Sequence, residues 1–181
     1  MTVARDYPKP GRKPDTASML RVDQAGEFGA TRIYAGQLAV MGDRHPMSRV
    51  IAGMAAQEAR HRQIFDRMLA ERKVRPTLLQ PFWDVAGYAL GAVTAAMGPE
   101  AAMACTAAVE TEIDRHYADQ REALDEHDAE LSAVVEDFQA EEVEHRDAAL
   151  AHGAEKAIGY ALLSGVIRLG CRAAIKLSAR I

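Results

Sequence analysis

Apolar residues recur at spacings of three and four through most of this chain, and that spacing places them on one face of an α-helix. Glycine, proline and aspartate residues divide the pattern into segments. The segments predict helices at about 16–40, 46–72, 82–97, 99–125, 128–153 and 155–180. Short connections at 42–45 and 126–128 make the helices on either side antiparallel neighbours.

The connection between these two hairpins is long. Roughly 25 residues separate the second helix from the bundle helix that opens at Pro99, and such a link can cross a bundle from end to end. The pattern therefore predicts an all-α, ferritin-like four-helix bundle with one long crossover helix and an extra C-terminal helix. We expect one domain over residues 17–181, and a disordered tail over residues 1–16, which contain three prolines.

Two Glu-x-x-His units lie inside apolar stripes. Glu58 and His61 are in register with Phe65 on one helix face, and Glu142 and His145 hold corresponding positions on a later helix. A surface glutamate would not follow the apolar stripe in this way. Because an ionised carboxylate in a core costs several kcal/mol unless something compensates it, these positions indicate a buried ligand site.

The other two bundle helices each add one glutamate to their apolar face. Glu27 precedes Glu58 by 31 residues and Glu110 precedes Glu142 by 32, so the chain contains a duplicated helix hairpin. This ligand inventory is that of the di-iron and di-manganese sites of ferritin-like bundles. Four carboxylates balance two divalent ions, and ligand sets without thiolate favour iron or manganese. The predicted metal ligands are Glu27, Glu58, His61, Glu110, Glu142 and His145; the alternative is a set of core polar residues that satisfy one another.

Two aromatic residues and a histidine lie near the predicted ligands. Tyr117 lies two turns from Glu110 on the same helix face, and His116 precedes it. Both are candidate catalytic residues that line the site. Tyr34 bears the same relation to Glu27. The competing interpretation is that aromatic residues in a bundle core serve packing alone.

The predicted metal histidines need partners as well. A histidine that binds a metal through one ring nitrogen normally uses the other N–H as a hydrogen-bond donor. Asp23 and Asp114 each lie one turn from a predicted ligand glutamate. We therefore expect these aspartates to orient the histidines.

Charge and cysteine content narrow the class of protein. With 22 basic and 26 acidic residues the net charge is −4, which gives no sign of a nucleic-acid partner. Cys105 and Cys171 lie in apolar helical segments outside any C-x-x-C pair, so we expect buried, reduced thiols. The N-terminal residues lack the apolar core of a secretory signal, and we expect a protein of the cytosolic compartment.

The C-terminal segment and the crossover segment predict contact with a membrane surface. Basic residues recur every four positions along the C-terminal segment, at Arg168, Arg172, Lys176 and Arg180. The rest of that segment is largely apolar, and the crossover segment 82–97 carries Asp84 as its only charge. Such helices suit an anionic membrane surface, although the crossover segment falls short of the ~20 apolar residues that spanning requires. The alternative is that both are ordinary helices packed on the bundle.

Several motifs resemble those of the demethoxyubiquinone hydroxylase family, and together they extend over about residues 17–181. The matching segments are 21–30 (RVDQAGEFGA), 32–37 (RIYAGQ), 58–61 (EARH), 104–110 (ACTAAVE), 116–117 (HY) and 141–145 (EEVEH). The resemblance implies a di-iron monooxygenase of ubiquinone biosynthesis that uses O₂ to hydroxylate a polyprenylated demethoxybenzoquinol ring. It also implies that the six predicted ligands bind two iron ions, with Glu58 and Glu142 as bridges.

The resemblance further implies a peripheral protein on the cytoplasmic side of the cell inner membrane, with a homo-oligomer or a partner protein of ubiquinone biosynthesis as candidate assemblies. NADH is one candidate electron donor, and the sequence contains no Rossmann fingerprint for it. Three other functions share features of this sequence. They are a soluble ferritin-like iron-storage or peroxide-scavenging protein, another membrane di-iron quinol oxidase, and a bundle without catalytic activity that binds partners.

Overall fold

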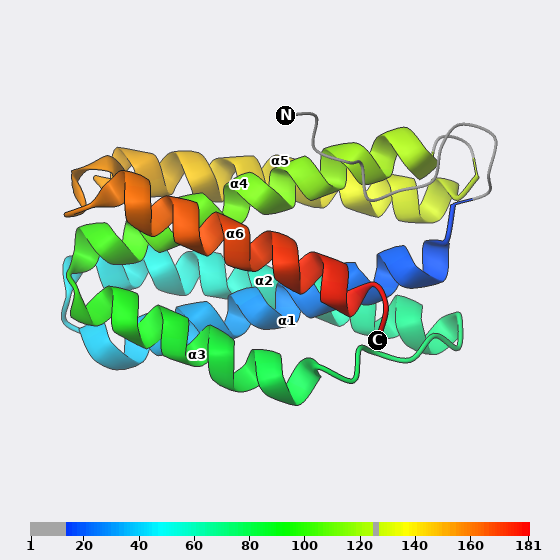
Figure 1. Ribbon diagram of the computed structural model, residues 1–181, viewed down its shortest axis with the longest axis horizontal. Helices are drawn as coiled ribbons and strands as arrows, with labels where there is room; N and C mark the ends of the chain where they lie inside the picture. Colours follow the sequence, from blue (N-terminus) through cyan, green and yellow to red (C-terminus); the bar gives the residue numbers. More distant parts are fainter. Residues whose placement is uncertain (1–13, 125–126) are drawn as a thin grey trace.

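The computed structural model describes residues 14–124 and 127–181, and the regular elements within them are all helical. The predicted tail, residues 1–16, lies mostly outside the described residues, and the first helix begins at Thr16. The elements are α1 (Thr16–Met41), α2 (Pro46–Glu71), α3 (Gln80–Ala96), α4 (Pro99–Leu124), α5 (Ala129–Ala151), the short 3₁₀ helix η1 (Ala154–Lys156) and α6 (Tyr160–Ser178). The predicted all-α, ferritin-like bundle is confirmed (Figure 1).

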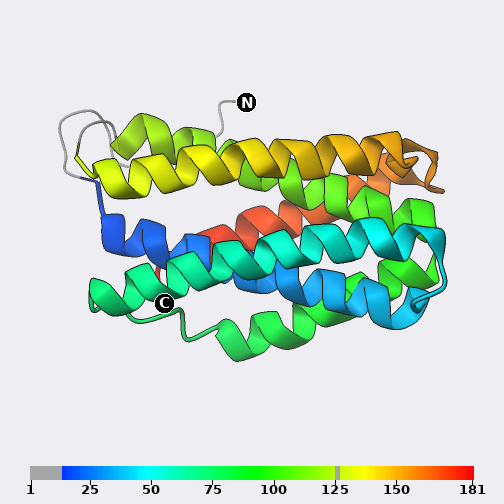
Figure 2. The ribbon, with the colours of Figure 1, turned by 180° about the vertical axis from the view of Figure 1, so that it is seen from behind.

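The four bundle helices form two antiparallel hairpins, α1 with α2 and α4 with α5. The crossover helix α3 packs against α1, and the C-terminal helix α6 packs against α4. Figure 1 shows α3 and α6 on one side of the bundle, and the reverse view in Figure 2 shows α2 and α5 on the opposite side. Among the described residues, no helix has the length and hydropathy needed to cross a bilayer.

Local chemistry sets the helix boundaries. Asp15 caps α1, since its carboxylate accepts a hydrogen bond from the Ser18 backbone N–H at 3.1 Å. Asp128 caps α5 in the same way through Leu131. The last helix begins later than predicted, at Tyr160, because Gly159 adopts φ 71°, in the left-handed region.

Helices α1 and α3 meet backbone to backbone. A Cβ atom added to Gly91 of α3 would lie 1.9 Å from the Ile33 carbonyl oxygen, and one added to Gly36 of α1 would lie 2.2 Å from the Tyr88 carbonyl oxygen. Real Cβ atoms do not approach other atoms this closely. Because glycine has no side chain, the backbones of α1 and α3 can approach this closely, and the crossover helix packs directly against the bundle.

The apolar core is divided into two main parts along the bundle axis. One contains Ile51, Met103 and Ala149, and the other contains Phe65 and Leu124 with their neighbours. On each bundle helix the predicted ligand glutamate falls between residues of these two parts. The polar side chains therefore form a layer across the middle of the bundle, closed by apolar residues at both ends.

Candidate metal centre

The six predicted ligands come together in this middle layer. They form two groups of four whose ligand atoms all lie within 4.8 Å of one another: Glu27, Glu58, His61 and Glu142, and Glu58, Glu110, Glu142 and His145. We call the six residues the carboxylate–histidine cluster. Glu58 and Glu142 belong to both groups, which is the placement that bridging carboxylates require.

Every side chain of the cluster is buried and has at least one potential metal-binding atom that lacks a hydrogen bond. All six side chains are at most 3% exposed. Each has at least one buried oxygen or nitrogen atom without a hydrogen-bond partner among the described residues, including both carboxylate oxygens of Glu58 and of Glu142. Buried polar atoms without partners are costly, and a pair of divalent cations would satisfy all of them. The residues therefore fit a dinuclear metal site.

Both histidines direct the same ring nitrogen toward the cluster. His61 Nδ1 lies 3.4 Å from Glu27 Oε2 and 3.2 Å from Glu142 Oε1. His145 Nδ1 lies 3.0 Å from Glu58 Oε1 and 3.2 Å from Glu142 Oε2. Each ring therefore presents Nδ1 as the nitrogen that could bind a metal.

The other ring nitrogens have partners that differ from the predicted ones. His61 Nε2 lies 3.1 Å from Glu141 Oε2, and His145 Nε2 lies 2.8 Å from Gln57 Oε1. Arg60 also donates to Glu141. Burial raises the pKa of Glu141, but the hydrogen bonds from Arg60 and His61 outweigh burial and keep that pKa below its usual value.

The expectation that Asp23 and Asp114 orient the histidine ligands is wrong. Asp23 Oδ1 lies 3.0 Å from His116 Nε2, and Asp23 Oδ2 accepts a hydrogen bond from Gln120 at 2.8 Å. Asp114 accepts from Gln139 and Arg146, each at 2.7 Å. Other side chains thus occupy both aspartates, while the Nε2 atom of each histidine contacts a residue of the opposite hairpin, Glu141 or Gln57.

The two tyrosines contact the cluster across the bundle. Tyr117 donates a hydrogen bond to Glu27 Oε1, and Tyr34 donates to Glu110 Oε1 at 2.8 Å. Each tyrosine thus binds the glutamate of the other hairpin, although it lies seven residues after the glutamate of its own helix. Burial and the neighbouring carboxylates raise the pKa of both phenols well above the usual value, so both remain hydrogen-bond donors.

Burial and crowding make the cluster retain protons when no metal is bound. Burial, and then the neighbouring carboxylates, raise the pKa of Glu58 and of Glu110 well above the usual range. Burial alone would lower the pKa of His61, but the nearby Glu142 and Glu27 carboxylates outweigh burial and raise it to about 10. Burial raises the pKa of Glu142, but the two imidazoles outweigh it and hold the value at about 2. Metal binding must displace protons, so metal affinity should increase with pH.

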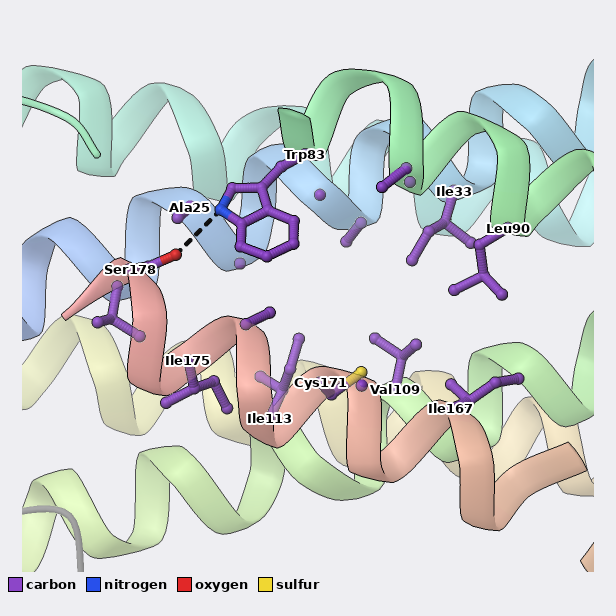
Figure 3. Close-up of a pocket in the computed structure, with 18 of the residues that line it drawn as sticks. Ala25, Ile33, Trp83, Leu90, Val109, Ile113, Ile167, Cys171, Ile175 and Ser178 are labelled. Atoms are coloured by element: carbon purple, nitrogen blue, oxygen red, sulfur yellow. Dashed lines mark hydrogen bonds between the residues drawn. The ribbon is translucent and has the colours of Figure 1, made fainter. Parts of the chain in front are cut away.

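An apolar pocket of about 360 Å³ lies between helices of the bundle and the two added helices (Figure 3). It is lined by residues of α1, α3, α4 and α6, and the hydrogen bond from Trp83 Nε1 to Ser178 Oγ, 3.0 Å long, joins α3 to α6 at one edge. Gly26 and Val109 line the pocket and immediately precede Glu27 and Glu110 in sequence. The sequence showed apolar helices but gave no sign that four of them enclose a cavity.

Comparison with known proteins identifies the family. The sequence model of the family described as ubiquinone biosynthesis protein COQ7 matches residues 14–178. The chain belongs to this family. The resemblance to demethoxyubiquinone hydroxylases is thereby confirmed.

Named COQ7-family relatives are hydroxylases. The chain is 52% identical over 162 residues to the 3-demethoxyubiquinol 3-hydroxylase of Rhodospirillum rubrum, with 90% of this chain and 76% of the relative covered. It is 51% identical over 166 residues to the NADPH-dependent 3-demethoxyubiquinone 3-hydroxylase, mitochondrial, of Rattus norvegicus, with the same coverage. It is 39% identical over 179 residues to the 5-demethoxyubiquinone hydroxylase, mitochondrial, of Saccharomyces cerevisiae, with 90% and 77% covered.

In this COQ7-family chain, two arginines of the predicted basic stripe have an internal role. Arg168 Nε donates to Glu112 Oε1 at 2.6 Å, and Arg172 Nε lies 3.4 Å from Glu112 Oε2. The Glu112 side chain is 1% exposed, so these two arginines compensate a buried carboxylate and join α6 to α4. Charge periodicity could not reveal this role, because the partner lies on another helix.

Proposed function

We propose that this chain is a di-iron monooxygenase that uses O₂ to hydroxylate the ring of a demethoxyubiquinol in ubiquinone biosynthesis. The observation that carries the proposal is a pair of overlapping four-residue ligand groups in a closed core, together with an apolar pocket lined by the residues that precede Glu27 and Glu110. Iron storage and peroxide scavenging would need no such substrate cavity, and the names of the relatives favour hydroxylation over quinol oxidation.

The protein groups have distinct roles in this proposal. Two iron ions bound to the cluster would supply redox chemistry and open coordination positions for O₂. Glu58 and Glu142 would bridge the ions, while Tyr34 and Tyr117 hold the two terminal glutamates in place. The apolar residues above and below the cluster exclude water from the reacting centre. His116, which contacts Asp23, remains a candidate site-lining residue.

The pocket provides a reason for a lipid-like substrate. Its lining is almost wholly apolar, and burial of each CH₂ group contributes about 0.8 kcal/mol. A polyprenyl tail placed between α3 and α6 would bring the ring toward the cluster through the side next to Gly26 and Val109. Substrates with shortened tails should therefore bind more weakly.

The central test follows the oxygen atom. Reduced protein supplied with ¹⁸O₂ and a demethoxyubiquinol should yield a hydroxylated ring that carries one labelled oxygen, measured by mass spectrometry. Label found only in water, with the ring unchanged, would favour an oxidase. For the reductant, NADH and NADPH are compared directly, since the rat relative is named as NADPH-dependent.

Filling the pocket should block the substrate without disturbing the metal site. A Cβ atom on Gly29, which lines the pocket, would meet no atom within 4 Å. Gly29→Leu should therefore fold, bind metal normally and lower kcat/KM on the order of 10- to 100-fold, mainly through KM. The control is Gly53→Leu, an exposed position on α2 that is equally open. Equal KM values for the two variants would exclude the pocket as the substrate site.

We also propose that this chain is a peripheral membrane protein that attaches to the cytoplasmic face of an inner membrane through α3 and α6. Side chains of Val85 on α3 and of Leu162 and Leu169 on α6 are apolar and 66–75% exposed. Figure 1 shows both helices on the same side of the bundle. Anchoring here would let a quinol pass from lipid into the pocket that the two helices line.

The membrane proposal predicts that a triple variant, Val85→Ser, Leu162→Ser and Leu169→Ser, loses most of its binding to anionic vesicles in a co-sedimentation assay. The control is Val40→Ser with Leu150→Ser, which removes exposed apolar side chains of α1 and α5. Arg168 and Arg172 are left intact because Glu112 depends on them. Equal retention of both variants on vesicles would contradict membrane anchoring through α3 and α6.

A further inference from the structure

The residue that precedes each Glu-x-x-His unit differs between the two hairpins. It is Gln57 before Glu58 and Glu141 before Glu142. These two residues occupy equivalent places in the duplicated hairpin, and each contacts the histidine of the other hairpin. Gln57 Oε1 lies 2.8 Å from His145 Nε2, and Glu141 Oε2 lies 3.1 Å from His61 Nε2.

A direct bond between Gln57 and Glu141 fixes the orientation of both partners. Gln57 Nε2 donates to Glu141 Oε2 at 3.2 Å. Because a carboxylate only accepts, the amide must present its nitrogen to Glu141 and its oxygen to His145. Both histidines then carry their proton on Nε2, which leaves Nδ1 of each ring free to bind a metal.

The two partners differ in charge, although the groups closest to the metal positions match. Each position has one histidine, one terminal glutamate held by a tyrosine, and the two shared carboxylates. A carboxylate acceptor polarises an imidazole N–H more than a neutral amide does, and the ring becomes a stronger electron donor. Arg60 binds Glu141, and its Nη2 atom also lies 3.3 Å from His61 Nε2, so it moderates this effect; its side chain is 45% exposed, and solvent weakens its influence.

We propose that Glu141 and Gln57 make the two metal positions unequal, so that the position of His61 binds a divalent ion more tightly than the position of His145. Both are positioning residues, since they act on the metal through a histidine. The proposal rests on the metal centre of the proposed function. The two hairpins also differ in the contact between Asp23 and His116, which lies near Glu27. Exchanging residues 57 and 141 alone leaves that contact unchanged, so the exchange measures the effect of Gln57 and Glu141 separately.

The test measures stepwise binding of Co²⁺ to the full-length, metal-free protein, without oxygen, by titration of the visible absorption. We expect two ions per chain and two dissociation constants that differ about tenfold or more. Glu141→Gln should weaken the tighter step about tenfold, so that the two steps approach each other. Circular dichroism of each metal-free variant verifies folding.

Single-histidine variants assign the steps. With His145→Ala, which retains His61, the remaining ion should bind more tightly than with His61→Ala. In the double exchange Gln57→Glu with Glu141→Gln, one carboxylate and one amide are kept, and this order should reverse. Unequal steps whose order does not reverse, or two equal steps in the unaltered protein, would overturn the inference. Fewer than two bound ions in the unaltered protein would instead contradict the metal centre itself.

Discussion

Glu142→Ala should eliminate the dinuclear metal site and reduce hydroxylation on the order of a thousandfold or more. Glu142 belongs to both ligand groups, and both of its carboxylate oxygens are buried without a hydrogen bond. Its removal takes one donor atom from each metal position at once. Iron content, measured by elemental analysis after anaerobic loading, should fall well below two per chain, and the ring product should disappear.

Glu144→Ala is the matched control for this prediction. Glu144 lies on the same helix two residues away, but it is exposed. That variant should retain its iron and its activity. If Glu142→Ala also retained two iron ions per chain, the assignment of the cluster as the metal centre would be contradicted.

Gly91→Ala should destabilise the fold by about 3 kcal/mol or more, although alanine normally favours a helix. The added methyl group would lie 1.9 Å from the Ile33 carbonyl oxygen, so α3 must move away from α1. Because α3 also lines the pocket, substrate affinity should fall together with the free energy of unfolding. Urea denaturation followed by circular dichroism measures the first effect, and KM measures the second.

Gly53→Ala provides the comparison. A Cβ atom at this exposed position of α2 would meet no other atom within 4 Å, so only helix propensity acts. We expect Gly53→Ala to gain up to about 1 kcal/mol. A similar gain for Gly91→Ala would show that α1 and α3 are not in backbone contact.

The burial of the candidate ligand residues could be predicted because helical periodicity is local. Glu58 and Glu142 lie in register with apolar neighbours on one helix face. In a bundle the apolar face of each helix packs into the core, so these two residues are buried with it. The partners of the histidines could not be predicted in the same way. Gln57 and Glu141 reach them from the opposite hairpin, and contacts between hairpins depend on how the helices are rotated about their axes.

The pocket and the contacts of the α6 arginines could not be predicted from the sequence, because both depend on which helices are neighbours. Four helices line the pocket, and its glycines are informative only once it is known which face each helix turns inward. Arg168 and Arg172 are spaced like a surface stripe, and only the position of Glu112 on α4 shows that they turn toward the bundle. Spacing along one helix does not identify the neighbouring helix.

The crossed contacts have a consequence for symmetry. Tyr34 and Gln57 of the first hairpin contact a glutamate and a histidine of the second. Tyr117 and Glu141 of the second hairpin contact the corresponding residues of the first. A homodimer of single hairpins could build such a site around a two-fold axis, but each copy would have to carry the same residue before its Glu-x-x-His unit. Joining both hairpins in one polypeptide removes that constraint, and only then can a glutamine face a glutamate across the axis.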